Sequence, residues 1–400
     1  MQAFKPENGV PVKIWAEKGS IEQGAIDQIE NTARLPFAFH HVALMPDGHQ
    51  GYGAPIGGVL ATKDVVVVNF VGVDIGCGMC AVKTSLKEIS QEEIKKIFGG
   101  SKEHKGGIRS CVPVGFSHHS KAHPEWMPEL PKEDLPIAMS QYDSACKQVG
   151  TLGGGNHFIE IQKGSDGYIW IMLHSGSRNL GYKVANHYNE LAKYWNKKWY
   201  SSVPKEWDLA FLPIDSEDGS MYLAEMNYCL DFARANRAAM MNNILKCFAE
   251  QYYPRPINEN LNETLIDIHH NYATMENHFG TNVMVHRKGA TRAREGEIGI
   301  IPGSQGTKSY IVRGKGNSES FMSCSHGAGR KLGRKAASRE LDLEKEINMM
   351  NEKGIIHSIR TEKDLDEAPG AYKDIDQVMN NQEDLVEIVV ELSPLAVIKA

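Results

Sequence analysis

Five side chains of types that commonly bind metal ions lie far apart in the sequence, each at the edge of an apolar run. They are one aspartate, one cysteine and three histidines: Asp74, Cys77, His157, His174 and His270. Carboxylate, thiolate and imidazole groups together can hold a divalent transition metal. Their wide separation predicts a metal centre that is assembled by folding, in place of a local zinc knuckle. This number of donors suits a site with one ion or with two.

Each donor also has a simpler interpretation when it is considered alone. A single histidine on an apolar strand is most often a hydrogen-bonded core residue, because buried polar groups are normally paired. Cys77 and Cys80 form a CxxC motif, but no βαβ unit follows it, so a redox pair is not favoured. The five donors together favour a metal centre, and the softness of thiolate and imidazole favours zinc in it.

A further histidine, His326, lies in the glycine-rich segment Ser325 to Arg330. A neutral imidazole nitrogen is a competent nucleophile at phosphorus. We predict a basic helix from Gly329 to Glu340, and the amides of its first turn would face a phosphate at His326. This pattern predicts phosphoryl chemistry at His326.

Two other segments have compositions that suit anion binding. His174 to Arg178 places hydroxyl groups and an arginine after a candidate metal ligand, although the same residues also suit a tight turn. Gly303 to Ser309 combines glycines with hydroxyl groups, and its spacing is not that of a Walker A loop. Both are candidate phosphate-binding loops.

The stretch from Arg287 to Arg339 is rich in Lys and Arg and has only three acidic residues, Glu295, Glu297 and Glu319. A solvated basic face explains such a cluster equally well. Its overlap with the glycine-rich segments favours phosphate binding. Because the net charge of the chain is -6, any binding of nucleic acid must come from a local patch.

The composition is that of an ordinary globular protein, with 400 residues, 41% hydrophobic and 24% charged. Residues 1–19 show no secretory signal, and the apolar runs are far shorter than the roughly 20 residues of a membrane-spanning helix. The seven cysteines show no disulfide framework. We therefore expect a cytoplasmic protein with reduced thiols, no membrane partner and a monomeric state.

The elements that must position these residues alternate between short strands and helices. Ser90 and Glu93 form a capping-box pattern that predicts a helix over Gln91 to Phe98. Helical spacing predicts a long helix over Met221 to Tyr253, and residues 101–135 read as a loop-rich insertion. Strands are predicted at the following segments: 41–45, 65–68 running through to 78, 157–161, 168–173, 264–268, 283–286, 299–301, 309–312 and, around Ser393-Pro394, 385–399. Because the candidate ligands span about half of the chain, we expect one functional domain, residues 1–400.

Ordered motifs along nearly the full chain resemble the RtcB family of GTP-dependent RNA-splicing ligases. The matching segments are Met45 to His49, Gly72 to Gly78, Gly153 to Glu160, Leu173 to Arg178, His269 to Tyr272, His286 to Ala290, Pro302 to Ser304, Ser325 to Arg330 and Ala371 to Asp376. The resemblance implies an α+β fold with mixed, largely antiparallel sheets and flanking helices around a central metal site.

The resemblance also implies roles for individual residues. It makes Asp74, Cys77, His157, His174 and His270 the ligands of two manganese ions, bridged by Cys77, and it makes His326 the nucleophile that takes GMP from GTP. Nucleotide contacts are implied for Asn156, Glu160, Ser304, Ser309, Gly327, Ala328, Gly329 and Lys399. Other positions implied to line the substrate and phosphate site are Asp47, Arg178, Lys288 and Arg330.

The implied reaction joins RNA ends that carry a 2',3'-cyclic phosphate or 3'-phosphate to 5'-hydroxyl ends, in tRNA processing or RNA repair. GMP passes from GTP to the histidine and then to the RNA 3'-phosphate. RNA and GTP are the expected partners, with an archease-type activator as a further one. Two other hypotheses remain: a metal-dependent phosphoesterase without a covalent step, and an RNA-binding protein without catalysis that uses the basic stretch.

Overall fold

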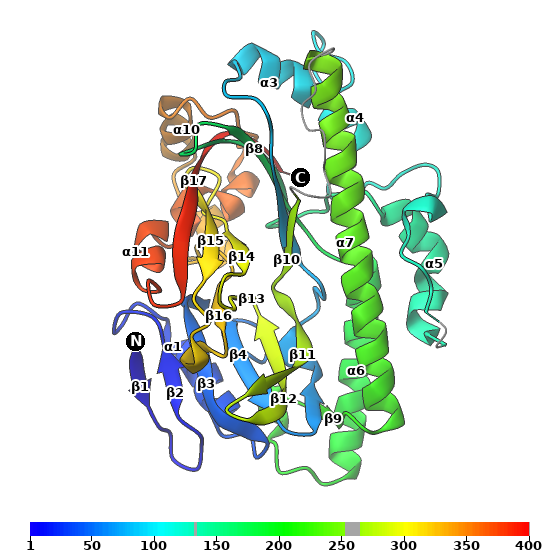
Figure 1. Cartoon of the computed structure of the whole chain (residues 1–400), viewed down its shortest axis with the longest axis vertical. Helices are drawn as coiled ribbons and strands as arrows, with labels where there is room; N and C mark the ends of the chain where they lie inside the picture. Colours follow the sequence, from blue (N-terminus) through cyan, green and yellow to red (C-terminus); the bar gives the residue numbers. More distant parts are fainter. Residues whose placement is uncertain (132–133, 253–264, 400) are drawn as a thin grey trace.

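Two large β-sheets and one long helix dominate the fold (Figure 1), for which a computed structural model describes residues 1–131, 134–252 and 265–399. The first sheet has six strands in the order β1-β2-β3-β4-β12-β11 and is antiparallel except between β2 and β3. Its strands are β1 (Gln2–Phe4), β2 (Val12–Ile14), β3 (Ala38–His49), β4 (Ile56–Thr62), β11 (Asn271–His278) and β12 (Thr281–Lys288).

The second sheet has seven strands in the order β10-β6-β8-β7-β17-β15-β14, and all of its pairs are antiparallel. Its strands are β6 (Gly78–Lys83), β7 (Phe158–Gly164), β8 (Ile169–Ser175), β10 (Ile266–His269), β14 (Ile298–Ile301), β15 (Ser309–Gly314) and β17 (Val386–Ile398). Two small two-stranded sheets pair β5 (Val65–Val67) with β9 (Phe211–Pro213) and β13 (Ala290–Arg292) with β16 (Ser323–Ser325).

Helices cover the outside of these sheets. The α-helices are α1 (Gln23–Ala33), α2 (Val68–Val71), α3 (Gln91–Phe98), α4 (Ile108–Cys111), α5 (Pro136–Gln148), α6 (Arg178–Lys198), α7 (Glu217–Tyr252), α9 (Arg334–Glu340), α10 (Leu343–Glu352) and α11 (Ile375–Asn380). Short 3-10 helices are η1 (Pro124–Trp126), η2 (Lys205–Trp207), η3 (Ser318–Ser320), η4 (Glu362–Glu367) and η5 (Pro369–Ala371). Figure 1 shows α7 running along one side of the molecule, with α5 and α6 beside it.

The apolar layer between α7 and the second sheet holds the strands that carry the candidate ligands. Met240, Ile244 and Phe248 of α7 are buried in one cluster with Ile159 of β7 and Ile171 of β8. Every residue of β8 is buried, which explains its nearly continuous apolar sequence. This packing fixes the ends of β6, β7 and β8 at one place.

The largely antiparallel α+β prediction is confirmed. The helix at Gln91–Phe98 has the predicted capping box, because Ser90 accepts from the Glu93 amide and Glu93 accepts from the Ser90 amide. The long helix begins at Glu217, and Tyr253, its predicted last residue, lies outside the described residues. Thr264, predicted to begin a strand, also lies outside them, and that strand begins at Ile266. The insertion at 101–135 has only α4 and η1 among its described residues.

Three predictions of local structure were wrong. The chain after Val67 turns into the short helix α2 before it reaches Asp74. The closing strands are one strand, β17, with an irregular register beside Pro394, which lacks an amide proton. The basic helix begins at Arg334 and not at Gly329, because the amides of Lys331 and Leu332 donate to Ala371 of another segment. Within the described residues, no helix is long and apolar enough to cross a membrane.

Candidate metal centre and nucleotide pocket

The five predicted donors converge at the ends of neighbouring strands. Asp74 and Cys77 lie on the turn between α2 and β6, where Gly76 adopts a φ of 72°. His157 immediately precedes β7, and His174 lies on β8. The remaining donor, His270, lies between β10 and β11. Folding therefore brings together residues that are almost 200 positions apart in the sequence.

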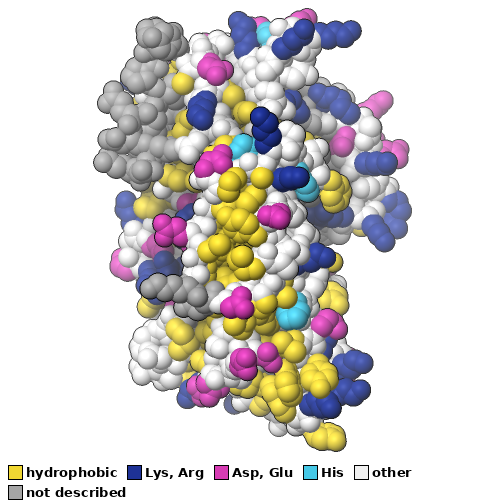
Figure 2. Space-filling view, turned by 90° about the vertical axis from the view of Figure 1, so that its right-hand side faces the viewer, with side chains coloured by type: hydrophobic (Ala, Val, Ile, Leu, Met, Phe, Trp, Pro, Cys, Tyr) yellow, Lys and Arg dark blue, Asp and Glu magenta, His cyan; other side chains and the backbone are white. Residues whose placement is uncertain are grey.

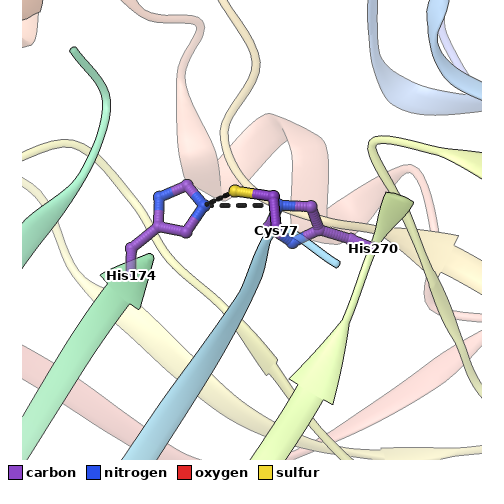
Figure 3. Close-up of side chains that lie close together, drawn as sticks. All are labelled: Cys77, His174 and His270. Atoms are coloured by element: carbon purple, nitrogen blue, oxygen red, sulfur yellow. Dashed lines mark hydrogen bonds between the residues drawn. The ribbon is translucent and has the colours of Figure 1, made fainter. Parts of the chain in front are cut away.

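The donors form two groups that share Cys77. Cys77, His174 and His270 make one group and Asp74, Cys77 and His157 the other, and within each group the donor atoms lie within 4.8 Å of one another. The sulfur of Cys77 is 3.1 Å from His174 Nε2, which is 3.3 Å from His270 Nε2 (Figure 3). Two nitrogens bound to one metal ion at about 2.0–2.1 Å lie at a similar separation. The arrangement suits two ions with a shared thiolate.

Backbone carbonyls orient two of the imidazole rings. His157 Nδ1 lies 2.9 Å from the carbonyl oxygen of Leu152, and His174 Nδ1 lies 3.1 Å from that of Asn156. A neutral ring that donates from Nδ1 keeps the lone pair of Nε2 free, which is the tautomer that a metal ligand needs. His270 Nδ1 is buried without a protein partner in the part of the chain that the structure describes. The rings are therefore held with Nε2 facing the other donors.

Burial keeps most of this cluster uncharged in the metal-free protein. It raises the pKa of the Cys77 thiol and lowers the pKa values of His174 and His270. For Asp74, burial alone would raise the pKa, but hydrogen bonding with His157 outweighs it and lowers the pKa to about 2. Divalent cations would supply the positive charge that a buried thiolate requires. The donor set therefore fits metal ions.

His326 lies directly beside the donor cluster. Its ring centre is 4.9 Å from that of His270. His326 Nδ1 is 2.6 Å from Asp47 Oδ2, and the same oxygen accepts the His326 amide at 3.1 Å. Asp47 is completely buried, so its carboxylate is a fixed acceptor. This hydrogen bond leaves Nε2 of His326 with the free lone pair, as a nucleophile requires.

A pocket of about 220 Å³ opens next to His326. The predicted nucleotide residues that line it are Asn156, Glu160, Ser304, Gly327, Ala328, Gly329 and Lys399, and Arg330 and His174 also contribute. Asn156, Phe158 and Glu160 share this face of the chain, while His157 points to the metal donors, as the alternation of side chains predicts. The pocket and the donor cluster thus meet at His326 and His174.

The carboxylate of Glu367 forms ion pairs with the cationic side chains of the pocket. Arg330 Nη1, Arg334 Nη2 and Lys399 Nζ lie 3.1, 3.4 and 3.1 Å from its oxygens, and the hydroxyl of Tyr372 donates to it. Three cations against one carboxylate leave a net positive charge. Burial raises the pKa of Glu160, on the same pocket, to about 8, so that this side chain adds no negative charge at neutral pH. The pocket therefore suits an anion.

Four residues that the sequence assigned to the site lie outside this pocket. Ser309 is buried and accepts hydrogen bonds from Gln162 and the Gly303 amide, so it supports the pocket loop. Asp47 lies behind His326. Lys288 is buried and its Nζ donates to carbonyl oxygens of Tyr52 and Asn69.

Arg178 is the fourth residue outside the pocket, and it lies at the start of α6. Its guanidinium donates to Thr151 Oγ1 at 3.2 Å and to the carbonyl oxygen of Gly115 at 3.3 Å. It packs so closely over Gly153 that any Cβ there would clash with it. Glycine at 153 is therefore required for this placement of Arg178.

The structure changes the interpretation of the basic stretch. Arg287 is completely buried and bound to Glu276, and Arg292 pairs with Glu297. Arg330 and Arg334 pair with Glu367. The folded stretch therefore offers less free positive charge than its composition suggests, because folding brings in carboxylates from other segments.

Nine residues that line the pocket were not among the predicted site residues: His49, Ile56, Phe158, Pro302, Gly303, Gln305, Arg334, Glu367 and Tyr372. Phe158 and Tyr372 lie inside motifs that the sequence singled out, so their position beside predicted contacts was an available signal. Glu367 lies in an ordinary acidic segment, and nothing in its sequence context indicates three cationic partners.

Comparison with known proteins gives one consistent result. The family model described as tRNA-splicing ligase RtcB matches residues 28–400. An RNA-splicing ligase RtcB of Escherichia coli (strain K12) is 38% identical over 411 residues, covering 97% of each chain. A tRNA-splicing ligase RtcB of Thermococcus kodakarensis is 32% identical over 465 residues, covering 99% of this chain and 96% of its own. One of Nanoarchaeum equitans is 33% identical over 460 residues, covering 98% and 95%.

Proposed function

Because this chain belongs to the RtcB family of RNA-splicing ligases, we propose that it joins RNA 3'-phosphate or 2',3'-cyclic phosphate ends to 5'-hydroxyl ends with GTP as the energy source. The observation that carries the proposal is the position of His326. Its ring lies 4.9 Å from His270 of the donor cluster and lines the pocket that holds Arg330 and Lys399. A nucleotide in that pocket would place its phosphates next to His326.

The first step we propose is transfer of GMP to His326. His326 Nδ1 donates a hydrogen bond to Asp47, which holds the ring so that Nε2 attacks the α-phosphorus of GTP. A nitrogen–phosphorus bond forms, the bond to the β-phosphate oxygen breaks, and pyrophosphate leaves. Divalent ions bound by the five donors would neutralise the triphosphate charge. Arg330, Arg334 and Lys399 contribute positive charge from the other side of the pocket.

Two transfers then complete the reaction. An oxygen of the RNA 3'-phosphate attacks the phosphorus of the GMP, which regenerates His326 and gives an RNA end capped by a mixed anhydride. The 5'-hydroxyl of the second RNA end attacks the RNA phosphate, and GMP leaves. A 2',3'-cyclic phosphate must first be opened by water to a 3'-phosphate. The leaving groups are pyrophosphate in the first transfer, the imidazole of His326 in the second and GMP in the third, so each bond that forms has a matching bond that breaks.

The identity of the ions is a separate proposal. The family resemblance supports two manganese ions, whereas the thiolate and imidazoles alone favour zinc. We propose manganese, and metal-stripped protein that regains ligation with zinc but not with manganese would contradict this. GTP, an archease-type activator, a monomeric state and one catalytic domain over residues 1–400 are further parts of the proposal. All seven cysteines are free thiols, which supports a cytoplasmic location.

A ligation assay tests the function. The purified chain is incubated with manganese, GTP, one RNA with a 2',3'-cyclic phosphate end and one with a 5'-hydroxyl end. We expect a joined product that requires GTP. Opening of the cyclic phosphate without a GTP requirement and without a joined product would contradict the ligase and support a phosphoesterase that uses the same donors.

A further inference from the structure

The end of α6 and the loop after it concentrate positive and aromatic side chains that belong neither to the donor cluster nor to the pocket beside His326. Residues 192–205 contain no acidic residue, and they carry Lys193, Lys197, Lys198, Lys205, Tyr194, Trp195, Trp199 and Tyr200. Lysines interleaved with aromatic rings are typical of surfaces that bind single-stranded nucleic acid. Nothing in the proposed chemistry uses these residues.

Five of these residues, Lys193, Tyr194, Lys197, Tyr200 and Lys205, line a cavity of about 700 Å³, which we call the α6 groove. Its walls are α6 from Glu190 to Lys197 and the loop from Tyr200 to Ala210. Figure 2 shows the face of the molecule that carries α7; at its lower end, where α6 ends in Figure 1, Lys and Arg side chains lie beside hydrophobic ones. The groove therefore combines a hollow with both kinds of side chain.

The aromatic rings of the groove are exposed on a rigid support. Tyr200 is 94% exposed, Tyr194 52% and Trp199 44%. Trp199 stacks on Trp195, with ring centres 5.6 Å apart, and Trp195 Nε1 donates to Asp218 at 2.6 Å. Tyr200 has a φ of 52°, a backbone conformation that non-glycine residues rarely adopt. Aromatic rings that are left open to solvent can stack on bases.

The charges of the groove are only partly neutralised. Lys193 pairs with Asp208 at 3.0 Å and with Glu190 at 3.3 Å. Across the described ranges, Lys197 and Lys205 have no carboxylate within salt-bridge distance. The groove therefore has free positive charge for phosphate groups, unlike the predicted basic stretch.

Helix α6 connects this groove to the reaction site. It begins at Arg178, whose guanidinium interacts electrostatically with Asp74 and Cys77. It ends at the groove. Its 21 residues span about 31 Å at 1.5 Å per residue. A stacked strand that rises about 3.4 Å per nucleotide would cover this distance with roughly nine nucleotides.

We propose that the α6 groove binds the single-stranded flank of an RNA whose end lies at His326. The proposal rests on the ligase function and adds a second contact for the same substrate. Bases stack on Tyr200 and Tyr194, and Lys197 and Lys205 contact the backbone phosphates. RNA ends with a long flank then bind more tightly than ends too short to reach the groove.

Three variants test the groove without touching the reaction site: Lys197→Glu, Tyr200→Ala and Tyr200→Phe. Fluorescence anisotropy measures their affinity for a single-stranded RNA of about 20 nucleotides and for one of about four, which cannot span the roughly nine nucleotides needed. We expect Lys197→Glu and Tyr200→Ala to bind the long RNA about 5- to 100-fold more weakly, with little change for the short one. Tyr200→Phe keeps an aromatic ring and should bind the long RNA about as tightly as wild type does. Lys345→Glu, an exposed lysine of α10, is the matched charge control.

A second readout identifies phosphate contact directly. For a lysine that contacts one phosphate, the slope of log affinity against log salt should fall by about 0.7 in Lys197→Glu and stay unchanged in Lys345→Glu. All variants should still accept GMP from GTP, because that step needs no RNA. If wild type takes GMP but the long RNA binds all variants equally with the same salt slope, the RNA groove is wrong and a protein partner would better explain the surface. If wild type takes no GMP, the ligase function itself fails.

Discussion

Two clusters of charged residues in this molecule are built in opposite ways. In the first, Arg287 is completely buried, and its guanidinium donates to Glu276, Ser323, the Phe321 carbonyl and the Tyr272 hydroxyl at 2.6 to 3.3 Å. In the second, around His326, the charges do not balance. The donor cluster brings a carboxylate, a thiol and three imidazoles together, and the pocket on the other side has three cations against the carboxylate of Glu367.

This difference separates stability from function. A buried charge with all of its partners in place contributes to the folded state and has nothing left to offer a ligand. Groups whose charges the protein itself does not balance remain available, and here they favour cations on one side of His326 and an anion on the other. A nucleotide triphosphate with divalent ions has both.

The largest change in free energy is expected at the first cluster, around Arg287. Glu276→Gln leaves the guanidinium of Arg287 buried without a counter-charge, so the free energy of unfolding should fall by about 3–5 kcal/mol. Urea unfolding measures it. The control is Glu387→Gln, which breaks the exposed pair with Arg313 and should change stability by less than about 1 kcal/mol. Equal, small losses of unfolding free energy in both variants would show that the buried pair stabilises the fold no more than the exposed pair does.

A substitution in the second cluster, around His326, should weaken metal binding. Cys77→Ala removes the donor that both groups share, and we expect metal affinity to fall more than about 100-fold, or about 2.7 kcal/mol. Metal content after dialysis, measured by elemental analysis, checks this. Cys80→Ala, a buried thiol outside both groups, should keep its metal. Metal retained by Cys77→Ala would mean that the thiol is only a core residue.

A fall in pH should reduce the stability that the first cluster, around Arg287, contributes to the fold. Burial alone would raise the pKa of Glu276, but Arg287 and His278 outweigh it and hold the pKa well below the ordinary value of 4.5. The folded state therefore favours the carboxylate above pH 4.5, and this stabilisation is lost as the pH falls below it. We expect wild type to lose about 2 kcal/mol more than Glu276→Gln between pH 6 and pH 3 in urea unfolding. Parallel pH profiles for the two proteins would contradict the ion pair.

The smallest effect is expected at the edge of the pocket. Arg334→Ala removes one of the three cations around Glu367, and we expect the KM for GTP to rise about tenfold, or about 1.4 kcal/mol, without loss of metal. Arg339→Ala is the control on the same helix, because Arg339 is exposed and pairs with Glu340. A loss of metal in Arg334→Ala would show that the two sides of His326 are not separate.

The sequence revealed the types of the functional residues better than their surroundings. Carboxylate, thiol and imidazole groups at the ends of apolar runs predicted the donors, and the Ser90–Glu93 pattern predicted α3, because both signals are local. The partners of charged residues depend on folding. Glu276 and Glu367 lie outside the basic stretch, so the sequence of the stretch did not reveal them as partners of its arginines. The basic helix was placed five residues too early because the contacts with Ala371 cannot be predicted from the local sequence.

The central claim is that His326 forms a bond to GMP. The most direct measurement is to incubate the protein with radiolabelled GTP and manganese and to map the label by mass spectrometry. The account predicts an acid-labile, alkali-stable label on His326 that is absent from His326→Ala. A wild-type protein without label, or a His326→Ala variant that still takes it, would contradict the account.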